Sequence, residues 1–374
     1  MNYIGSKRRL LAQIAELLKV EMGPLSGTVL DAFAGTGVVS QWFKSTGCRV
    51  IANDWQHYSA LVTQQGLCWD EWPTFSKLAE GLSVTPSRAT DIIPFSYISQ
   101  PMTDLPSSLI KVLSYLLNLK GTRGEFYEQY CEGGHGGRLY FSAENGQKIQ
   151  AIRDKIETWQ GGDLISLSEA NWLTAALLES ADRVGNTAAV YGSFLKAIKV
   201  TAAVPFRLYV QAPTVSLVVS AGKVACESAE LFIRNNRGQG DVSLIYADPP
   251  YNGRQYASNY HVLETIARWD LGSWQPRGKT GLRPSELNRS HFCMPKTVRS
   301  AFQSIFDAAA PVPLLLSYNN EGLMTETAIR DLAARYYKTC QFLKLPYARF
   351  QSDTASEKRT IRKNGVEEFL ILCK

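Results

Sequence analysis

The stretch Gly27-Thr28-Val29-Leu30-Asp31-Ala32-Phe33, followed directly by Ala34-Gly35-Thr36-Gly37, decides the fold. The apolar run predicts a buried strand, and the glycines predict a sharp turn into a helix that continues through Lys44. Residues 48–53 predict a second strand, closed by Asp54. A strand-helix-strand unit of this kind indicates a parallel sheet, and therefore an α/β fold.

The glycine turn also predicts a ligand site. Gly35 and Gly37 let the backbone approach a ligand closely at the N-terminus of a helix. An acidic residue about 20 positions after such a turn, here Asp54, can accept hydrogen bonds from both hydroxyls of a ribose. Together they predict an adenosine-containing ligand, and Ser40 in the place of a third glycine weighs against a pyrophosphate. In the alternative interpretation, the glycines only form a turn and Asp54 caps it.

A second motif, Asp248-Pro249-Pro250-Tyr251, follows the apolar run Val242–Ala247, which predicts another strand. The two prolines keep the chain after this strand extended and stiff. Because ligands bind at the C-terminal ends of parallel strands, Asp248 is expected to share a cleft with the glycine turn. The Asp248 carboxylate and a proline carbonyl only accept hydrogen bonds, which suits a planar amino group as substrate.

The chemistry expected of this motif is attack by that amino group. Two N–H groups directed at the acceptors would draw the nitrogen toward tetrahedral geometry and free its lone pair. As positive charge grows on the substrate, the Asp248 carboxylate would stabilise it without a metal. Tyr251 offers a ring against which a base rotated out of a duplex can stack. Alone, the tetrapeptide could equally be a strand-ending turn with a packed tyrosine.

A long, mainly helical insertion separates the two motifs. Within it, Ser142 is expected to cap a helix that runs to Trp159, and Ser166 with Glu169 forms a capping-box pattern ahead of another helix. Further strands are predicted over residues 206–210, 214–219 and 312–318, with two more at the C-terminal end. Helices are predicted over residues 257–269 and 325–336.

In type and order, these motifs resemble those of the D12-class adenine-specific DNA N6-methyltransferases, the group that includes Dam. The segments that carry the resemblance are Tyr3-Ile4-Gly5-Ser6-Lys7, residues 31–37, Asn53-Asp54 and the tetrapeptide at 248–251. Residues 140–145, 252–256 and 259–265 are similar to the branch that contains the FokI and NlaIII methylases. The resemblance implies a Rossmann-like S-adenosylmethionine-dependent methyltransferase fold, with a mostly parallel sheet and an inserted, mainly helical DNA-recognition region.

The resemblance also implies the activity and the roles of single residues. It implies S-adenosylmethionine as the cofactor and site-specific methylation of adenine N6 in double-stranded DNA, by a methylase of a restriction-modification system, a phage methylase or an orphan one. Tyr3 and Lys7 would position the methionine end of the cofactor, and Asp54 would bind its ribose. Glu227, in Cys226-Glu227-Ser228-Ala229, roughly matches a family segment near the cofactor adenine that usually contains Asp, which implies that Glu227 borders the adenine. The residues that would cradle the cofactor are Asp31, Phe33, Ala34, Gly35, Thr36 and Gly37, and the catalytic ones are Asp248, Pro249, Pro250 and Tyr251.

Three segments follow from this interpretation. Residues 1–65 would form the cofactor-binding part of the catalytic domain, residues 66–190 the inserted target-recognition region, and residues 191–374 the part that carries the tetrapeptide. The last segment has basic loops at 268–299 and 352–365, and basic side chains interleaved with aromatic ones can contact phosphates and bases. The candidate DNA contacts are Arg254, Arg277, Lys279, Arg283, Arg289, Lys358 and Arg359.

Composition narrows the setting of the protein. A formal net charge of +6 over 374 residues is mildly basic, which agrees with a polyanionic partner without requiring one. No signal-peptide pattern or membrane-spanning apolar run is seen, so a cytoplasmic protein is expected. The resemblance implies double-stranded DNA as a partner, together with a cognate restriction endonuclease acting at the same site, and a monomer is expected. Seven scattered cysteines without a C-x-x-C pair predict neither disulfides nor a metal site. The alternatives are an RNA methyltransferase, a catalytically silent nucleic-acid-binding module and a nucleotide-dependent oxidoreductase.

Overall fold

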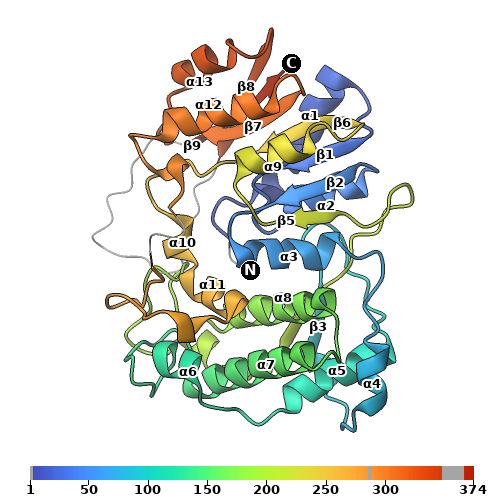
Figure 1. Cartoon of the computed structure of the whole chain (residues 1–374), viewed down its shortest axis with the longest axis vertical. Helices are drawn as coiled ribbons and strands as arrows, with labels where there is room; N and C mark the ends of the chain where they lie inside the picture. The colour runs from blue at the N-terminus through green and yellow to red at the C-terminus, as the bar shows by residue number, and fades with distance from the viewer. Residues whose placement is uncertain (1–2, 285–288, 348–365) are drawn as a thin grey trace. The chain divides into compact units, whose positions relative to one another are not determined.

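The computed structural model describes residues 3–284, 289–347 and 366–374 (Figure 1). The chain forms two compact units and alternates between them. The sheet unit consists of Tyr3–Trp55, Ser216–Tyr256 and Asn288–Lys374. The helical unit includes Gln56–Val215 and Ala257–Leu287, and therefore contains the whole predicted insertion together with residues on both sides of it.

The sheet unit is organised around a seven-stranded sheet with the order β5-β2-β1-β6-β7-β9-β8. The pairs from β5 to β7 are parallel, whereas β9 is antiparallel to both β7 and β8. The strands are β1 (Thr28–Asp31), β2 (Arg49–Asn53), β5 (Lys223–Ala225), β6 (Val242–Ala247), β7 (Leu314–Asn319), β8 (Cys340–Tyr347) and β9 (Val366–Cys373). The predicted α/β class and mostly parallel sheet are confirmed.

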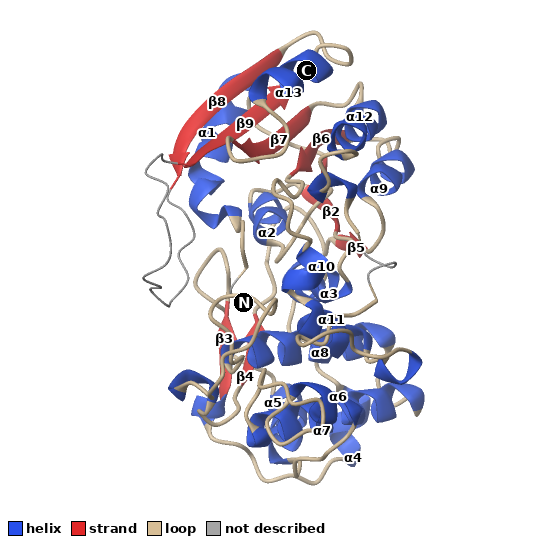
Figure 2. Ribbon diagram, turned by 90° about the vertical axis from the view of Figure 1, so that its left-hand side faces the viewer, coloured by secondary structure: helices blue, strands red, loops and turns tan. Residues whose placement is uncertain are grey.

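Helices cover both faces of this sheet (Figure 2). On one face, Leu30 of β1 and Ile245 of β6 belong to an apolar core that includes residues of α9, α12 and α13. On the other face, the rings of Tyr246 in β6 and Phe43 in α2 lie 6.4 Å apart. The helices of this unit are the 3-10 helices η1 (Lys7–Leu10) and η6 (His291–Cys293), and α1 (Leu11–Met22), α2 (Val38–Ser45), α9 (Ala229–Asn236), α12 (Val298–Ala309) and α13 (Glu326–Ala333).

The helical unit packs its helices around a two-stranded parallel sheet and around one another. Its elements are α3 (His57–Leu67), α4 (Ser76–Gly81), η2 (Ala89–Asp91), β3 (Ile92–Phe95), α5 (Ser107–Asn118), α6 (Glu125–Tyr130), α7 (Ala143–Gly161), α8 (Leu167–Arg183), η3 (Val200–Ala202), β4 (Leu208–Gln211), α11 (His261–Arg268) and η4 (Leu271–Ser273). The predicted caps are confirmed, because Ser142 accepts a hydrogen bond at the start of α7 and Ser166 forms a capping box with Glu169 at the start of α8. In the part of the chain that the structure describes, no helix combines the length and apolarity needed to cross a membrane.

Residues 259–265 stabilise the helical unit through two buried polar side chains. The Glu264 carboxylate of α11 accepts hydrogen bonds from the backbone N–H groups of His57 and Tyr58, at 3.2 and 2.9 Å, and so caps α3. His261 Nε2 lies 2.9 Å from the Tyr191 carbonyl oxygen. Burial lowers the pKa of His261 to about 4, so the imidazole is neutral and donates this hydrogen bond.

Two expectations about secondary structure are wrong. Residues 214–219 form no strand and pair with none of the described strands, and Leu217 and Val218 are exposed there. The predicted helix over 257–269 is interrupted at Tyr260, which separates α10 (Tyr256–Asn259) from α11. The short strands β3 and β5 were not predicted, because each is defined by pairing with a partner distant in the sequence.

Candidate active site

The glycine turn after β1 is tied to the end of β2. Gly35 and Gly37 have φ values of 58° and 74°, in the left-handed region that favours glycine. The Gly35 N–H donates a hydrogen bond to Asp54 Oδ2 at 2.9 Å. Asp54 therefore lies directly beside the turn, as expected for two parts of one ligand site.

Asp31, the last residue of β1, is a fully buried carboxyl group. Its two oxygens accept hydrogen bonds from Ser40 Oγ at 2.6 Å and from the Phe33 N–H at 3.4 Å. Burial raises the pKa of Asp31 to about 7, against the effect of these hydrogen bonds and with a smaller contribution from nearby Asp248 and Asp54. Ser40 stands at the position of the missing third glycine, and its hydroxyl anchors the carboxylate at the base of the turn.

Asn53 connects the end of β2 to the loop that carries Glu227. Its Nδ2 donates to the carbonyl oxygens of Ala32 and Glu227 at 3.2 and 3.1 Å, and its Oδ1 accepts from the Glu227 N–H at 3.0 Å. The Glu227 side chain lies 3.4 Å from Asn235 Nδ2 of α9. The Glu227 backbone is thereby fixed beside the ends of β1 and β2.

The tetrapeptide begins where β6 ends. Because β6 is parallel to β1, Asp248 emerges at the same edge of the sheet as the glycine turn. Its Oδ1 lies 3.2 Å from Lys7 Nζ, and the Lys7 side chain is only 3% exposed. The Tyr251 carbonyl accepts hydrogen bonds from the Leu323 N–H at 2.9 Å and the Tyr318 hydroxyl at 3.4 Å, so the loop after β7 holds the end of the motif.

The N-terminal segment touches both motifs. A Cβ atom on Gly35 would lie 2.8 Å from the ring of Tyr3, so Tyr3 packs directly on the glycine turn. At the other end of the segment, Lys7 Nζ lies against Asp248 and 5.5 Å from the ring centre of Tyr251. Residues 3–7 thus bring the turn and the tetrapeptide into one site.

Glu368 of β9 is a member of this site that the sequence reasoning missed. Its Oε2 lies 3.4 Å from Lys7 Nζ, and the residue is 2% exposed. Burial raises the pKa of Asp248 to about 7; Lys7 opposes this shift and Glu368 adds to it. For Lys7 the two carboxylates outweigh burial, so its pKa is raised and the side chain is an ammonium. An acidic residue at the start of the apolar run in β9 was the available signal.

The remaining predicted cofactor and catalytic residues surround these groups. Ala34 and Thr36 are buried within the glycine turn, and the ring of Phe33 packs edge-on against Phe292, with centroids 5.3 Å apart. Pro249 is buried and Pro250 is partly buried behind Asp248. All the predicted cofactor and catalytic residues belong to the sheet unit.

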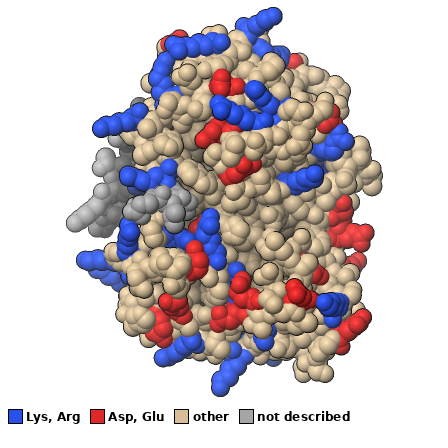
Figure 3. Space-filling view, viewed as in Figure 1, with Lys and Arg blue, Asp and Glu red and all other residues tan. Residues whose placement is uncertain are grey.

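The candidate DNA contacts are distributed over both units. In the sheet unit, Arg254 and Arg289 are exposed on two loops. Two hydrogen bonds join these loops: the Gln255 side chain accepts from the Ser290 N–H at 2.7 Å and donates to the Ser290 carbonyl oxygen at 3.1 Å. Lys358 and Arg359 lie outside the described residues. On the face drawn in Figure 3, basic and acidic side chains are intermixed, so charge does not single out one continuous DNA-binding patch there.

In the helical unit, Arg277 and Lys279 belong to a braced turn, defined as residues 277–282. Arg138 donates to the carbonyl oxygens of Gly278 and Lys279 at 3.1 and 3.2 Å, and the Tyr130 hydroxyl donates to that of Gly281 at 2.7 Å. The side chains of Arg277 and Lys279 are exposed. The turn therefore presents two cations from a backbone that buried side chains hold in place.

Arg283 has a different environment from the other candidates. Its guanidinium is 8% exposed and forms a two-pronged ion pair with Asp270, with N–O distances of 2.7 and 2.6 Å. It also lies 4.6 Å over the ring of Trp274. These contacts favour a structural role for Arg283 at the base of the braced turn.

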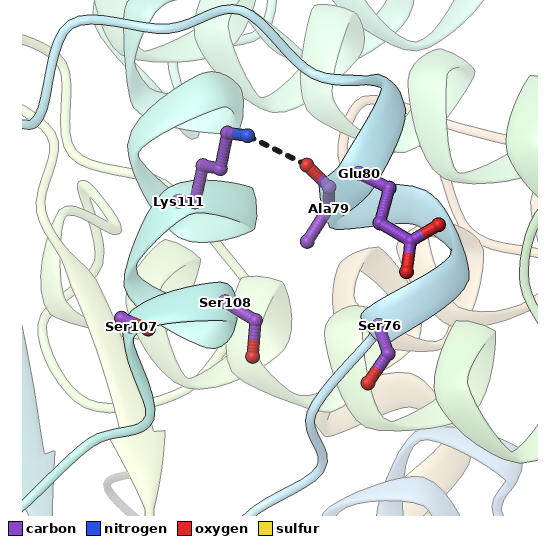
Figure 4. Close-up of a pocket in the computed structure, with 6 residues that line it drawn as sticks. All are labelled: Ser76, Ala79, Glu80, Ser107, Ser108 and Lys111. Carbon is purple, nitrogen blue, oxygen red and sulfur yellow. Dashed lines mark hydrogen bonds between the residues drawn. The ribbon is translucent and has the colours of Figure 1, made fainter.

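A surface pocket of about 400 Å³ lies between α4 and α5 in the helical unit (Figure 4). Lys111 Nζ donates a hydrogen bond across it to the Ala79 carbonyl at 2.7 Å. Its lining residues are Ser76, Ala79, Glu80, Ser107, Ser108 and Lys111. None of these is a predicted site residue, so the pocket is separate from the site described above.

Comparisons with known proteins agree with this geometry. The model of the D12 class N6 adenine-specific DNA methyltransferase family matches residues 3–331. The chain is 36% identical over 373 residues to the type II methyltransferase M.NlaIII of Neisseria lactamica, covering 99% of this chain and 98% of that protein. It is 30% identical over 360 residues to the type II methyltransferase M.FokI of Planomicrobium okeanokoites and 28% identical over 366 residues to the modification methylase StsI of Streptococcus sanguinis. These two alignments each cover 96% of this chain and 50% of the relative. The chain belongs to the D12 class of N6 adenine-specific DNA methyltransferases.

Proposed function

We propose that the chain transfers the methyl group of S-adenosylmethionine to adenine N6 in double-stranded DNA, at the edge of the sheet where β1, β2 and β6 end. The contacts made by residues 3–7 are the observation that supports this proposal. Tyr3 packs on the glycine turn and Lys7 pairs with Asp248, so a cofactor-binding motif and an acceptor motif lie side by side.

The residues present suit this cofactor. S-adenosylmethionine carries a sulfonium and an ammonium, and the buried carboxyl group of Asp31 lies at the end of β1, beside the glycine turn. The turn at Gly35 and Gly37 gives backbone access, and Asp54 beside it is placed for the ribose hydroxyls. The loop at Glu227, fixed by Asn53, would border the adenine.

The chain's own residues then act on the adenine. Bound S-adenosylmethionine supplies an electrophilic methyl group. The Asp248 carboxylate accepts an N–H of the amino group, and it stabilises the positive charge that grows on N6 during transfer. Lys7 holds Oδ1 of this carboxylate and so fixes its orientation. The Tyr251 ring offers a surface for the flipped base. The Leu323 N–H and the Tyr318 hydroxyl donate hydrogen bonds to the Tyr251 carbonyl oxygen and so fix the backbone of Tyr251.

We propose that DNA is contacted from both units. Arg254 and Arg289 would bind phosphates next to the active site, and Arg277 and Lys279 would do so from the braced turn. The segment 66–190 would read the target sequence, as part of the helical unit. We also propose a restriction endonuclease acting at the same site as the functional partner, in line with the type II relatives.

Calorimetry and methyl transfer together test this assignment. The wild-type protein should bind S-adenosylmethionine and transfer its label to duplex DNA. Asp248→Ala should keep the dissociation constant within about threefold while losing transfer, since its effect lies in the transition state. Equal loss of cofactor binding and transfer would remove Asp248 from the acceptor role, and labelling of RNA in preference to DNA would favour the RNA alternative.

A further inference from the structure

We propose that Glu368 is a positioning residue for methyl transfer, which shares the Lys7 ammonium with Asp248 and so keeps the Asp248 carboxylate available to the substrate. This inference rests on the proposed function of Asp248. It is carried by three side chains from three elements that meet in the sheet unit, namely η1, the end of β6, and β9.

The geometry places one cation between two carboxylates. Lys7 Nζ lies 3.2 Å from Asp248 Oδ1 and 3.4 Å from Glu368 Oε2, and the exposed fractions of the three side chains are 3%, 16% and 3%. Asp248 is thus the most exposed member of the cluster. Lys7 and Glu368 are closed off behind it, which places Asp248 as the one member that meets a substrate.

The charges explain why a second carboxylate is needed. A buried ammonium paired with a single carboxylate would compete with the substrate amino group for its oxygens. With Glu368 attached to the same ammonium, the cluster has one excess negative charge, which attracts the charge that develops on N6. Glu368 therefore acts through Lys7 without touching the substrate.

Strand register fixes Glu368 in this place. It pairs with Asn319 of β7 and with Leu345 of β8, so both neighbouring strands determine where its side chain leaves the sheet. Glu367, the preceding residue, is exposed. Glu367→Gln therefore changes the same charge on the same strand, away from Lys7, and is a matched control.

The test compares the pH profile of kcat for the wild type, Glu368→Gln and Glu367→Gln. The titratable groups that face Asp248 are Lys7, Asp31, Tyr246, Tyr251 and Glu368. Only the Glu368 charge differs between the wild type and Glu368→Gln. The variant should lower the alkaline plateau of kcat by about tenfold, the equivalent of about one pKa unit of interaction, and move the acid limb down by about one pH unit.

Two further measurements separate positioning from folding. Glu368→Asp keeps the charge, so its acid limb should stay near that of the wild type if the variant folds, which thermal unfolding reports. NMR titration of carboxyl-labelled aspartate should show a lower Asp248 pKa in Glu368→Gln, in the absence of cofactor and DNA.

The outcomes are distinct for the two proposals. If the wild type transfers no methyl group to DNA, the proposed function fails. If the wild type is active and Glu368→Gln has the same kcat plateau and acid limb, the positioning role of Glu368 is wrong while the proposed function stands. The same conclusion follows if Glu368→Asp behaves like Glu368→Gln.

Discussion

Replacing Asp248 by Asn should remove activity and at the same time stabilise the fold at alkaline pH. The variant keeps the size of the side chain and one acceptor oxygen for Lys7, but it loses the negative charge. Loss of this charge-stabilising group should lower kcat by about 100- to 1,000-fold, the cost of removing one preorganised electrostatic group. Binding of S-adenosylmethionine should change little.

The effect on stability follows from the raised pKa of Asp248. Burial raises it from 3.8 to about 7 in the folded chain, so between these values the folded state binds more protons than the unfolded state. The wild-type protein therefore becomes less stable as pH rises from 3.8 to about 7, because the buried Asp248 carboxyl group has to ionise in the folded state. Between pH 5 and pH 8, this loss of wild-type stability extends over the about two pH units from pH 5 to the folded-state pKa of about 7. Asn at position 248 does not titrate, so the stability of Asp248→Asn relative to wild type should rise by about 3 kcal/mol.

Urea unfolding at pH 5 and pH 8 measures this difference directly, and Asp331→Asn, at an exposed position of α13, is the control. A relative stability of Asp248→Asn that is independent of pH, or that falls toward pH 8, would refute the reasoning about burial. Retention of more than about a tenth of the wild-type kcat would refute the electrostatic role.

Three other variants probe the cofactor and DNA sites. Asp54→Ala should raise the dissociation constant of S-adenosylmethionine by about tenfold or more, because the ribose loses an acceptor for its hydroxyls; an unchanged constant in calorimetry contradicts the ribose role. Gly35→Ala should abolish cofactor binding, because the new Cβ would lie 2.8 Å from the Tyr3 ring. Gly23→Ala, also at positive φ but with no atom within 4 Å of the new Cβ, should lose only about 1–3 kcal/mol of stability. Equal cofactor binding by both variants would contradict the packing of Tyr3. Lys279→Ala should weaken DNA binding and reduce its salt slope by about 1, as expected for one lost phosphate contact. Lys19→Ala, at an exposed position of α1, should leave the slope unchanged. A fluorescence titration in which both variants keep the wild-type slope contradicts the contact.

The sequence predicted the parts of the fold that local patterns determine. The apolar runs that became β1 and β6, the glycine turn and the caps of α7 and α8 depend on near neighbours, and the family identified from these motifs is confirmed. The three-residue strand β5 and the exposed run at 214–219 were misjudged, because strand formation depends on a pairing partner that periodicity does not reveal.

The same distinction applies to the site. Asp248 and Asp54 were identifiable because each follows a strand within a recognisable motif. Glu368 was missed because it lies in no motif, and only the pairing of β9 with β7 brings it to Lys7. Similarly, Arg283 looked like a DNA contact by charge, and only the structure reveals that its side chain is 8% exposed and paired with Asp270.

We propose that this chain places a methyl group on adenine N6 in DNA through the site at Asp248. The most direct test is base-resolved mapping of duplex DNA after incubation with S-adenosylmethionine and either the wild type or Asp248→Asn. The predicted result is N6-methyladenine at one recurring sequence with the wild type, and formation at least about 100-fold slower with the variant. Methylation at another base, or N6-methyladenine at equal levels with both proteins, would contradict the account.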